Sequence, residues 1–428
     1  MGEVKLSGKG LPVTKKILAK ASGKEYVESG EFVEAKVGMV MVNDLTGPLA
    51  LDAFEKLKEK KVWDKNRIVI VLDHQIPADS VHSAELHKRL RRFAAEYGIK
   101  NFYDVGRGGI CHQVMVEKGH VKPGVVVVGA DSHTCTYGAL GAFATGIGST
   151  DAAAVFSTGS LWFKVPEVMR INVEGNLKPY VFPKDLILHV VGLIGEDGAI
   201  YMGLEFTGST IKKMGVEGRL TLCNMVVEAG AKTGIIEPDE KTIEYLKGRV
   251  KESFTPVYSD QDAKYEEELS LNVEDLEPQV ACPHSVSNVK PVDEVGDVEI
   301  DQAFIGSCTN GRIEDLRVAA KILEGRKVKD GVRLIVIPAS QEIYLQALKE
   351  GLFEVFVRAG AYIGPATCGP CLGGHFGLLA DGEVCISSTN RNFVGRMGSP
   401  KSKVYLASPA TVAASALTGK ITNPKKFM

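Results

Sequence analysis

The sequence predicts an α/β fold, because short apolar runs alternate along the chain with longer amphipathic segments. Four runs rich in Val and Ile are expected to form strands buried on both faces of parallel sheets, at residues 67–72, 124–129, 333–338 and 383–387. Apolar residues recur at helical spacing over residues 83–98, 311–325 and 340–353, which predicts helices there.

The length of 428 residues exceeds what one hydrophobic core supports, since single cores stop growing near about 250–300 residues. We predict three α/β domains, over residues 1–166, 167–282 and 283–428. The second boundary is placed by residues 255–297, an acidic stretch with scattered prolines and little periodicity that we expect to be a linker. The first boundary is placed at Pro166, where the composition changes.

Composition narrows the class of protein. Hydrophobic residues make up 44%, charged residues 24%, and the net charge is −2, as in ordinary globular proteins, so bulk charge gives no case for nucleic acid or a membrane surface. No apolar run approaches the roughly 18 residues of a membrane span, and residues 1–20 lack the apolar segment of a secretory signal. We therefore expect a cytoplasmic protein whose eight irregularly spaced cysteines stay reduced and serve a metal or catalytic role.

Polar clusters directly follow four predicted strands. Because ligands in open α/β sheets bind beyond the carboxyl ends of strands, these clusters are the candidate site. They are Asp73-His74-Gln75, Asp131-Ser132-His133-Thr134, Ser307-Cys308-Thr309-Asn310 and Ser388-Thr389-Asn390-Arg391.

The pair Cys368 and Cys371, in "GPATCGPCLGG", has the spacing of a redox dithiol and of a metal site. Structural zinc normally needs two such close pairs, and the chain has one. With Cys308 the pair could instead hold an iron–sulfur cluster through three thiolates, where four are usual, leaving one iron open as a Lewis acid. The spacing alone leaves the three readings open.

Several long motifs, in order, resemble the aconitase superfamily over residues 35–420. They are "LDHQIP", "GICHQV", "GADSHTCTYGALGAFATGIGSTDAA", "CNMVVEAGA", "FIGSCTNGRIEDL", "GPATCGPCLGG" and "STNRNFVGRMGSP". Within it, the chain is most similar to large subunits of the 3-isopropylmalate dehydratase and homoaconitase type. The resemblance implies three α/β domains of aconitase type around a central [4Fe–4S] cluster with one open iron, held by Cys308, Cys368 and Cys371.

The resemblance also implies roles for side chains around the cluster. It pairs Asp73 with His74, sets His133 beside Asp131, and pairs His112 with Glu228, for moving protons to and from a hydroxyl group and water. It implies that substrate carboxylates are bound by guanidinium groups, with polar neighbours close by. These expected substrate-binding residues are Arg391, Arg396, Ser132, Asn224, Asn310 and Asn390.

The reaction implied is the isomerisation of a 2-hydroxy acid to its 3-hydroxy isomer by dehydration and rehydration. The chain ends at Met428, soon after the motif that matches the end of the third domain. We therefore expect the fourth, swivelling domain and its catalytic serine to come from a small subunit. The loop over residues 42–50 carries Asn43 and Pro48 where many relatives have His and a polar residue, so no substrate contact is assigned to it.

Two substrates fit this resemblance. We favour 2-isopropylmalate, of leucine biosynthesis, with homocitrate, of lysine biosynthesis, as the alternative. Two alternative functions outside hydro-lyase catalysis are also considered: a cluster-free RNA-binding protein and a plain electron carrier. The first would require a basic surface, and the second would require a fourth cysteine ligand such as Cys111 or Cys385.

Overall fold

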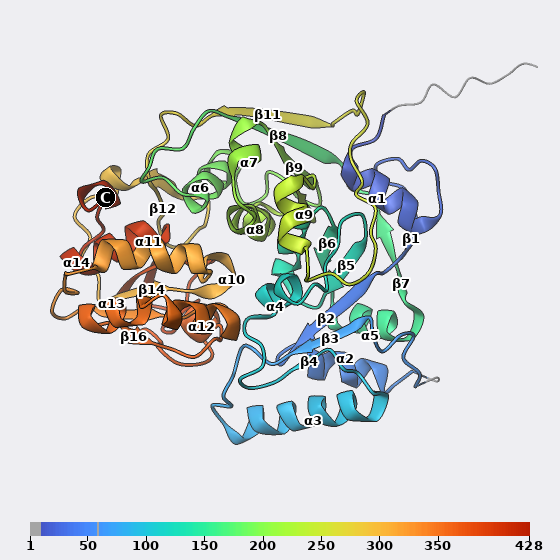
Figure 1. Ribbon diagram of the computed structural model, residues 1–428, viewed down its shortest axis with the longest axis horizontal. Helices are drawn as coiled ribbons and strands as arrows, with labels where there is room; N and C mark the ends of the chain where they lie inside the picture. Colours follow the sequence, from blue (N-terminus) through green and yellow to red (C-terminus); the bar gives the residue numbers. More distant parts are fainter. Residues whose placement is uncertain (1–9, 58–59) are drawn as a thin grey trace, which may run out of the picture.

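The computed structural model describes residues 10–57 and 60–428. Most strands belong to three sheets formed by successive stretches of the chain, with helices packed around them (Figure 1). The α/β prediction is therefore confirmed.

The first sheet has five parallel strands in the order β4-β3-β2-β5-β6. They are β2 (Met39–Asn43), β3 (Ile68–Val71), β4 (Phe102–Tyr103), β5 (Val126–Gly129) and β6 (Phe143–Gly146). Its helices are α1 (Val13–Ser22), α2 (Gly47–Phe54), α3 (Val81–Tyr97), α4 (Cys111–Glu117), the 3-10 helix η1 (Ser132–Leu140) and α5 (Ser149–Thr158). Strands β3 and β5 are buried along their whole length, as their continuous apolar runs predict. A two-stranded antiparallel ribbon, β1 (Phe32–Lys36) and β7 (Ser160–Lys164), lies beside this sheet.

The second sheet has four parallel strands in the order β10-β9-β8-β11. They are β8 (Val168–Glu174), β9 (Gly203–Thr207), β10 (Thr233–Ile235) and β11 (Glu267–Asn272). Its helices are α6 (Pro183–Ile194), α7 (Ser209–Lys213), α8 (Val216–Met225), the 3-10 helix η2 (Val226–Ala229) and α9 (Glu240–Leu246).

The third sheet has seven strands in the order β13-β12-β18-β17-β14-β15-β16. They are β12 (Gln279–Ala281), β13 (Val289–Pro291), β14 (Gln302–Ile305), β15 (Arg333–Val336), β16 (Tyr362–Ile363), β17 (Val384–Ser387) and β18 (Lys403–Leu406). The strands from β18 to β16 run parallel, while β12 pairs antiparallel with both neighbours. The helices are α10 (Ser307–Asn310), α11 (Ile313–Leu323), α12 (Gln341–Lys349), α13 (Leu352–Ala359) and α14 (Pro409–Thr418), with 3-10 helices η3 (Val292–Glu294), η4 (Gly369–Leu372) and η5 (Pro424–Lys426).

Two sequence-based predictions were wrong in detail. The predicted linker at residues 255–297 contains strands β11, β12 and β13. Strand β11 was hard to recognise because it is an edge strand that pairs only with β8, and its acidic side chains face solvent. The predicted helix at 340–353 is divided into α12 and α13 at Gly351, which has a left-handed backbone with φ of 74°.

One large cluster of buried apolar side chains runs through all three sheets, from Met39 to Ile421. Strand β12 precedes the predicted boundary at residue 282 but belongs to the third sheet. The division into three domains at 166 and 282 stays a prediction.

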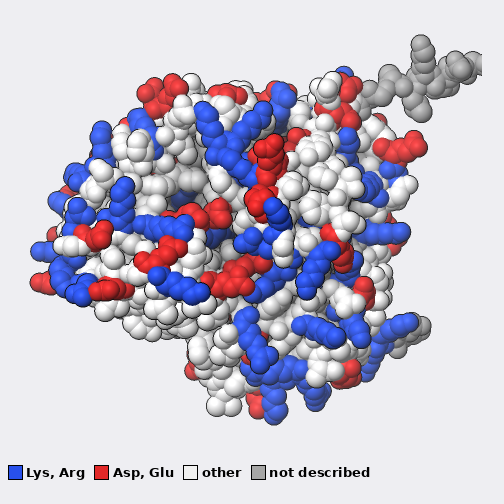
Figure 2. All heavy atoms as spheres, viewed as in Figure 1, with Lys and Arg blue, Asp and Glu red and all other residues white. Residues whose placement is uncertain are grey.

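The surface carries charges of both signs. Figure 2 shows Lys and Arg interspersed with Asp and Glu over the visible face, consistent with a net charge of −2. Within residues 10–57 and 60–428, no helix is both long and apolar enough to cross a membrane.

Candidate active site

Side chains from the ends of β3, β5, β14 and β17 meet around one cavity of about 270 Å³. The carboxyl ends of these strands bring together groups that are far apart in the sequence, as predicted. The lining residues are Leu45, His74, Ile110, Cys111, His112, Asp131, Ser132, His133, Cys308, Cys368, Cys371, Leu372, Asn390, Arg391 and Arg396.

His74 and Asp73 form the predicted pair, with 2.7 Å between His74 Nδ1 and Asp73 Oδ1. Behind them lies Asp44, whose carboxylate accepts hydrogen bonds from the backbone N–H groups of Asp73, His74 and Gln75. Burial opposes a charged imidazole at this position. The charges of Asp73 and Cys368 and hydrogen bonds to Asp44 and Asp73 outweigh burial, and the pKa of His74 is raised well above its ordinary value. His74 is therefore held as a proton-bearing imidazolium at the cavity wall.

His112 pairs with Asp131, and not with Glu228 as predicted. His112 Nε2 lies 2.9 Å from Asp131 Oδ1, and its Nδ1 lies 2.9 Å from the Tyr137 hydroxyl. Burial opposes ionisation of Asp131, but the neighbouring His112 and His133 hold the pKa of this carboxyl well below its usual range. Asp131 is thus an ionised acceptor that fixes the orientation of the His112 ring.

Glu228 instead pairs with His133 and Arg391. Its Oε1 is 2.8 Å from His133 Nε2, and Arg391 Nε donates to both carboxylate oxygens at 2.9 and 3.0 Å. Although burial favours the neutral acid, these two partners lower the pKa of Glu228. The sequence could not resolve which histidine Glu228 joins, because α4 and η1 place both His112 and His133 on the cavity wall, and η2 brings Glu228 up behind them.

Cys308, Cys368 and Cys371 are buried and face the same cavity. Cys308 follows Ser307, a non-glycine residue with φ of 78°, an uncommon conformation often found at functional sites. Gly369, within the close cysteine pair, has φ of 56°, which favours glycine, and a Cβ there would lie 2.3 Å from Ile337 Cδ1 and force that side chain to shift.

Two amides are directed at one of these sulfurs. Nδ2 of Asn224 and of Asn390 lie 3.3 and 3.5 Å from Cys308 Sγ. Burial raises the pKa of the Cys308 thiol to about 12, so a bound cation is needed to hold it as a thiolate at neutral pH. Ligand atoms of His112, His133 and Cys308 lie within 4.8 Å of one another, as do those of Asp73, His74 and Cys368.

The predicted substrate-binding residues divide into two groups. Ser132, Asn390, Arg391 and Arg396 line the cavity. Asn390 Oδ1 and Arg396 Nε are buried atoms without a hydrogen-bond partner in the described part of the chain, as expected of groups that await a ligand.

Asn224 and Asn310 do not line this cavity. Asn224 is fully buried behind Cys308, where it orients the thiol. Asn310 donates to Asp315 at 2.9 Å and lines a separate cavity, and its assignment to substrate binding stays a prediction.

Two supporting residues escaped sequence reasoning. Asp44 directly follows β2 and contacts both His74 and the buried His87, with 3.3 Å between Asp44 Oδ2 and His87 Nε2. The same strand-end rule that found Asp73 could have found Asp44.

Lys184 is fully buried on α6 and donates to the carbonyls of Ser388 and Thr389, holding the loop that carries Asn390. Burial lowers the pKa of Lys184 to about 7. No local sequence signal marks a buried lysine within a helix.

Comparison with known proteins matches the chain to the aconitase family (aconitate hydratase) over residues 15–298 and 288–419. It is 58% identical over 419 residues to 3-isopropylmalate dehydratase large subunit 1 of Methanopyrus kandleri, covering 98% of this chain and 100% of that protein. It is 57% identical to a probable 3-isopropylmalate dehydratase large subunit of Methanothermobacter thermautotrophicus, covering 97% of this chain and 99% of that protein. Among solved structures, aconitase X of Thermococcus kodakaraensis is similar at 13% identity and a TM-score of 0.48, covering 83% of this chain and 84% of that one.

An α/β scaffold that gathers buried thiols, histidine–carboxylate pairs and two arginines in one cavity defines an enzyme of the hydro-lyase class. The chain belongs to the aconitase family.

An iron–sulfur cluster is the cofactor that the family implies, and the donor set fits it. Soft thiols share the cavity, and amide N–H groups lie within hydrogen-bonding distance of one sulfur. Cys111 also lines the cavity, and burial together with the charges of Asp73 and Asp131 raises its pKa well above the ordinary value.

Proposed function

We propose that this chain is the large, cluster-bearing subunit of a 3-isopropylmalate dehydratase. The reaction converts 2-isopropylmalate to 3-isopropylmalate by loss of water and its re-addition at the neighbouring carbon. The observation that carries this proposal is a single cavity that combines four thiols, three histidine–carboxylate pairs and two arginines. Relatives at 55–58% identity that carry this name support it.

The cavity wall matches a substrate with two carboxylates and one apolar arm. Arg391 and Arg396 provide two guanidinium groups, one for each carboxylate. Leu45, Ile110 and Leu372 provide apolar surface for the isopropyl group. Homocitrate carries a third carboxylate in place of that arm, and this charge would be placed against apolar side chains at a cost in desolvation.

We further propose that Cys308, Cys368 and Cys371 hold a [4Fe–4S] cluster with one open iron. When bound, the cluster supplies a Lewis acid that weakens the bond between carbon and the departing hydroxyl group. His74, charged and oriented by Asp73, donates the proton that this hydroxyl takes up as it leaves as water. His112 and His133, each held by a carboxylate, position and deprotonate the water that adds back.

A base is also needed to remove the proton from carbon. We propose that a small subunit supplies it, as a serine on a swivelling domain that closes over the cavity. The relatives of this chain are named as large subunits, which supports a two-subunit enzyme.

The test is anaerobic purification, reconstitution with iron and sulfide, and assay with and without a candidate small subunit on 2-isopropylmalate and homocitrate. We expect turnover only with both cluster and partner, and a higher kcat/KM for 2-isopropylmalate. Preference for homocitrate would favour the homoaconitase alternative.

A matched pair of variants tests the ligand set, because both thiols lie on the cavity wall. Cys308→Ser should lose most of the iron, whereas Cys111→Ser should keep iron and sulfide at the wild-type ratio. Loss of iron in Cys111→Ser would indicate four thiolate ligands and an electron carrier.

A further inference from the structure

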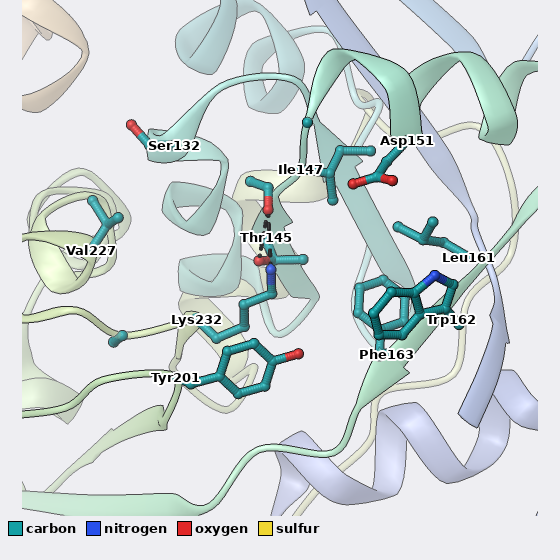
Figure 3. Close-up of a pocket in the computed structure, with 13 residues that line it drawn as sticks. Ser132, Thr145, Ile147, Asp151, Leu161, Trp162, Phe163, Tyr201, Val227 and Lys232 are labelled. Atoms are coloured by element: carbon teal, nitrogen blue, oxygen red, sulfur yellow. Dashed lines mark hydrogen bonds between the residues drawn. The ribbon is translucent and has the colours of Figure 1, made fainter. Parts of the chain in front are cut away.

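A second pocket, of about 460 Å³, adjoins the catalytic cavity. Ser132 lines both, and Val227, next to the catalytic Glu228, lines the second pocket from another side. Figure 3 shows Lys232 and Tyr201 extending into this pocket from one wall, with Leu161 and Trp162 on the opposite wall. Ser132 is therefore a wall that the pocket and the catalytic cavity share.

Large apolar side chains are exposed around this pocket. Trp162 on β7 is 63% exposed, and its ring lies 5.6 Å from that of Phe32 on β1, which is 65% exposed. Ile200, directly before Tyr201, is 67% exposed. Trp162 lines the pocket, while Phe32 contacts Trp162 and Ile200 precedes the lining Tyr201. Exposed aromatic side chains beside a pocket are typical of a protein interface, since aromatic residues contribute much of the binding energy there.

The pocket also contains a cation, Lys232. Its Nζ donates to the Gly146 carbonyl at 3.3 Å and lies 5.5 Å from the centre of the Tyr201 ring. Although Asp151 lines the same pocket, no ion pair of Lys232 within 4.0 Å is found in the described part of the chain. Tyr201 itself has φ of 62°, an uncommon conformation for a bulky residue, and this backbone presents its ring to the pocket.

We propose that this surface, formed by Phe32, Trp162, Ile200, Tyr201 and Lys232, is where the small subunit docks. The docking segment carries a carboxylate that pairs with Lys232 and, beside it, an apolar side chain that packs on Trp162. This inference rests on the proposed function, because a small subunit that completes the active site must approach the edge of the cavity. Trp162, Tyr201 and Lys232 line the pocket that shares Ser132 with the cavity, whereas Leu345 and Leu348 on α12 line neither pocket.

The experiment measures the dissociation constant between the cluster-loaded chain and its small subunit by biolayer interferometry under anaerobic conditions. Trp162→Ala and Lys232→Glu should each weaken binding by at least about 30-fold, the effect of an interface hot spot. Leu348→Ala is the matched control, because it removes a side chain that is 56% exposed elsewhere, and it should leave the dissociation constant within about twofold of wild type.

Activity distinguishes docking from catalysis. At excess small subunit, Trp162→Ala should regain a kcat close to wild type, because it affects assembly and not the chemical step. Wild-type dissociation constants for both Trp162→Ala and Lys232→Glu would overturn the docking surface alone. A change in the self-association of the isolated Trp162→Ala chain, with small-subunit binding intact, would overturn it in favour of a second copy as occupant. Failure of the wild-type chain to bind a small subunit or to turn over 2-isopropylmalate would overturn the proposed function as well.

Discussion

The ion pair between Glu228 and Arg391 permits a sharp test of the site. Glu228→Gln keeps the shape of the side chain and removes its charge. The variant removes the carboxylate partner of His133 Nε2 and the counter-charge of Arg391. We expect loss of both stability and activity.

The magnitude follows from burial. The Glu228 side chain is 2% exposed and that of Arg391 is 21% exposed. Removing one partner of a buried ion pair costs about 3–5 kcal/mol, because the other charge stays buried and uncompensated. Loss of an oriented proton-transferring histidine lowers kcat by about 10²–10⁴-fold.

A second Arg–Glu pair in the chain provides the control. Arg317 donates to Glu350 at 2.8 and 2.6 Å, but these side chains are 45% and 30% exposed. Glu350→Gln should leave the unfolding midpoint and kcat near those of wild type, since solvent screens exposed pairs. The assay is urea unfolding of the cluster-free chains followed by circular dichroism, together with kcat of the reconstituted enzymes.

A double variant separates stability from catalysis. Glu228→Gln with Arg391→Met removes both charges, so it should recover most of the lost stability while the activity stays low. If Glu228→Gln unfolds at the same urea concentration as wild type and keeps kcat within a few-fold, the role assigned to this ion pair is refuted.

Three further predictions concern other parts of the molecule. Leu372→Arg should lower kcat/KM for 2-isopropylmalate by about 10–100-fold and reduce its advantage over homocitrate, and an unchanged ratio from steady-state assays would exclude Leu372 from the apolar wall. Asp44→Asn should lower kcat by about 10–100-fold with iron content unchanged, because His74 loses a charged neighbour, and wild-type kcat would contradict this support. Burial and the charge of Lys118 lower the pKa of His120 to about 4, so the folded chain favours the neutral imidazole. The stability that neutral His120 contributes is therefore complete above pH 6.5 and is lost as the pH falls towards 4. The difference between the pKa of His120 in the folded and unfolded chain corresponds to about 3 kcal/mol. In urea unfolding, His120→Gln should therefore lose less stability than wild type when the pH falls from 7.5 to 4.5. Equal losses in the two proteins would disprove this role of His120.

Local signals determined much of the candidate site. Strand ends are marked by apolar runs that stop at polar residues, and this pattern alone located Asp73, Asp131, Cys308 and Asn390. The strands themselves were recognisable because both faces of β3 and β5 are buried. The acidic edge strand β11 was missed, since a solvated edge carries no apolar pattern.

Pairing between side chains was decided by the tertiary structure. Glu228 and His133 are 95 positions apart, and their contact depends on how η1 and η2 are packed against each other. Sequence spacing gives no distance across such an interval, so the resemblance to a family suggested residues that do lie close together but named the wrong partner for His112. The second pocket beside Ser132 likewise exists only because β6, β7 and the loops around Tyr201 and Lys232 meet in space. The sequence by itself therefore determined the fold class and the kinds of chemistry present, whereas the packing of distant elements decided which groups act together.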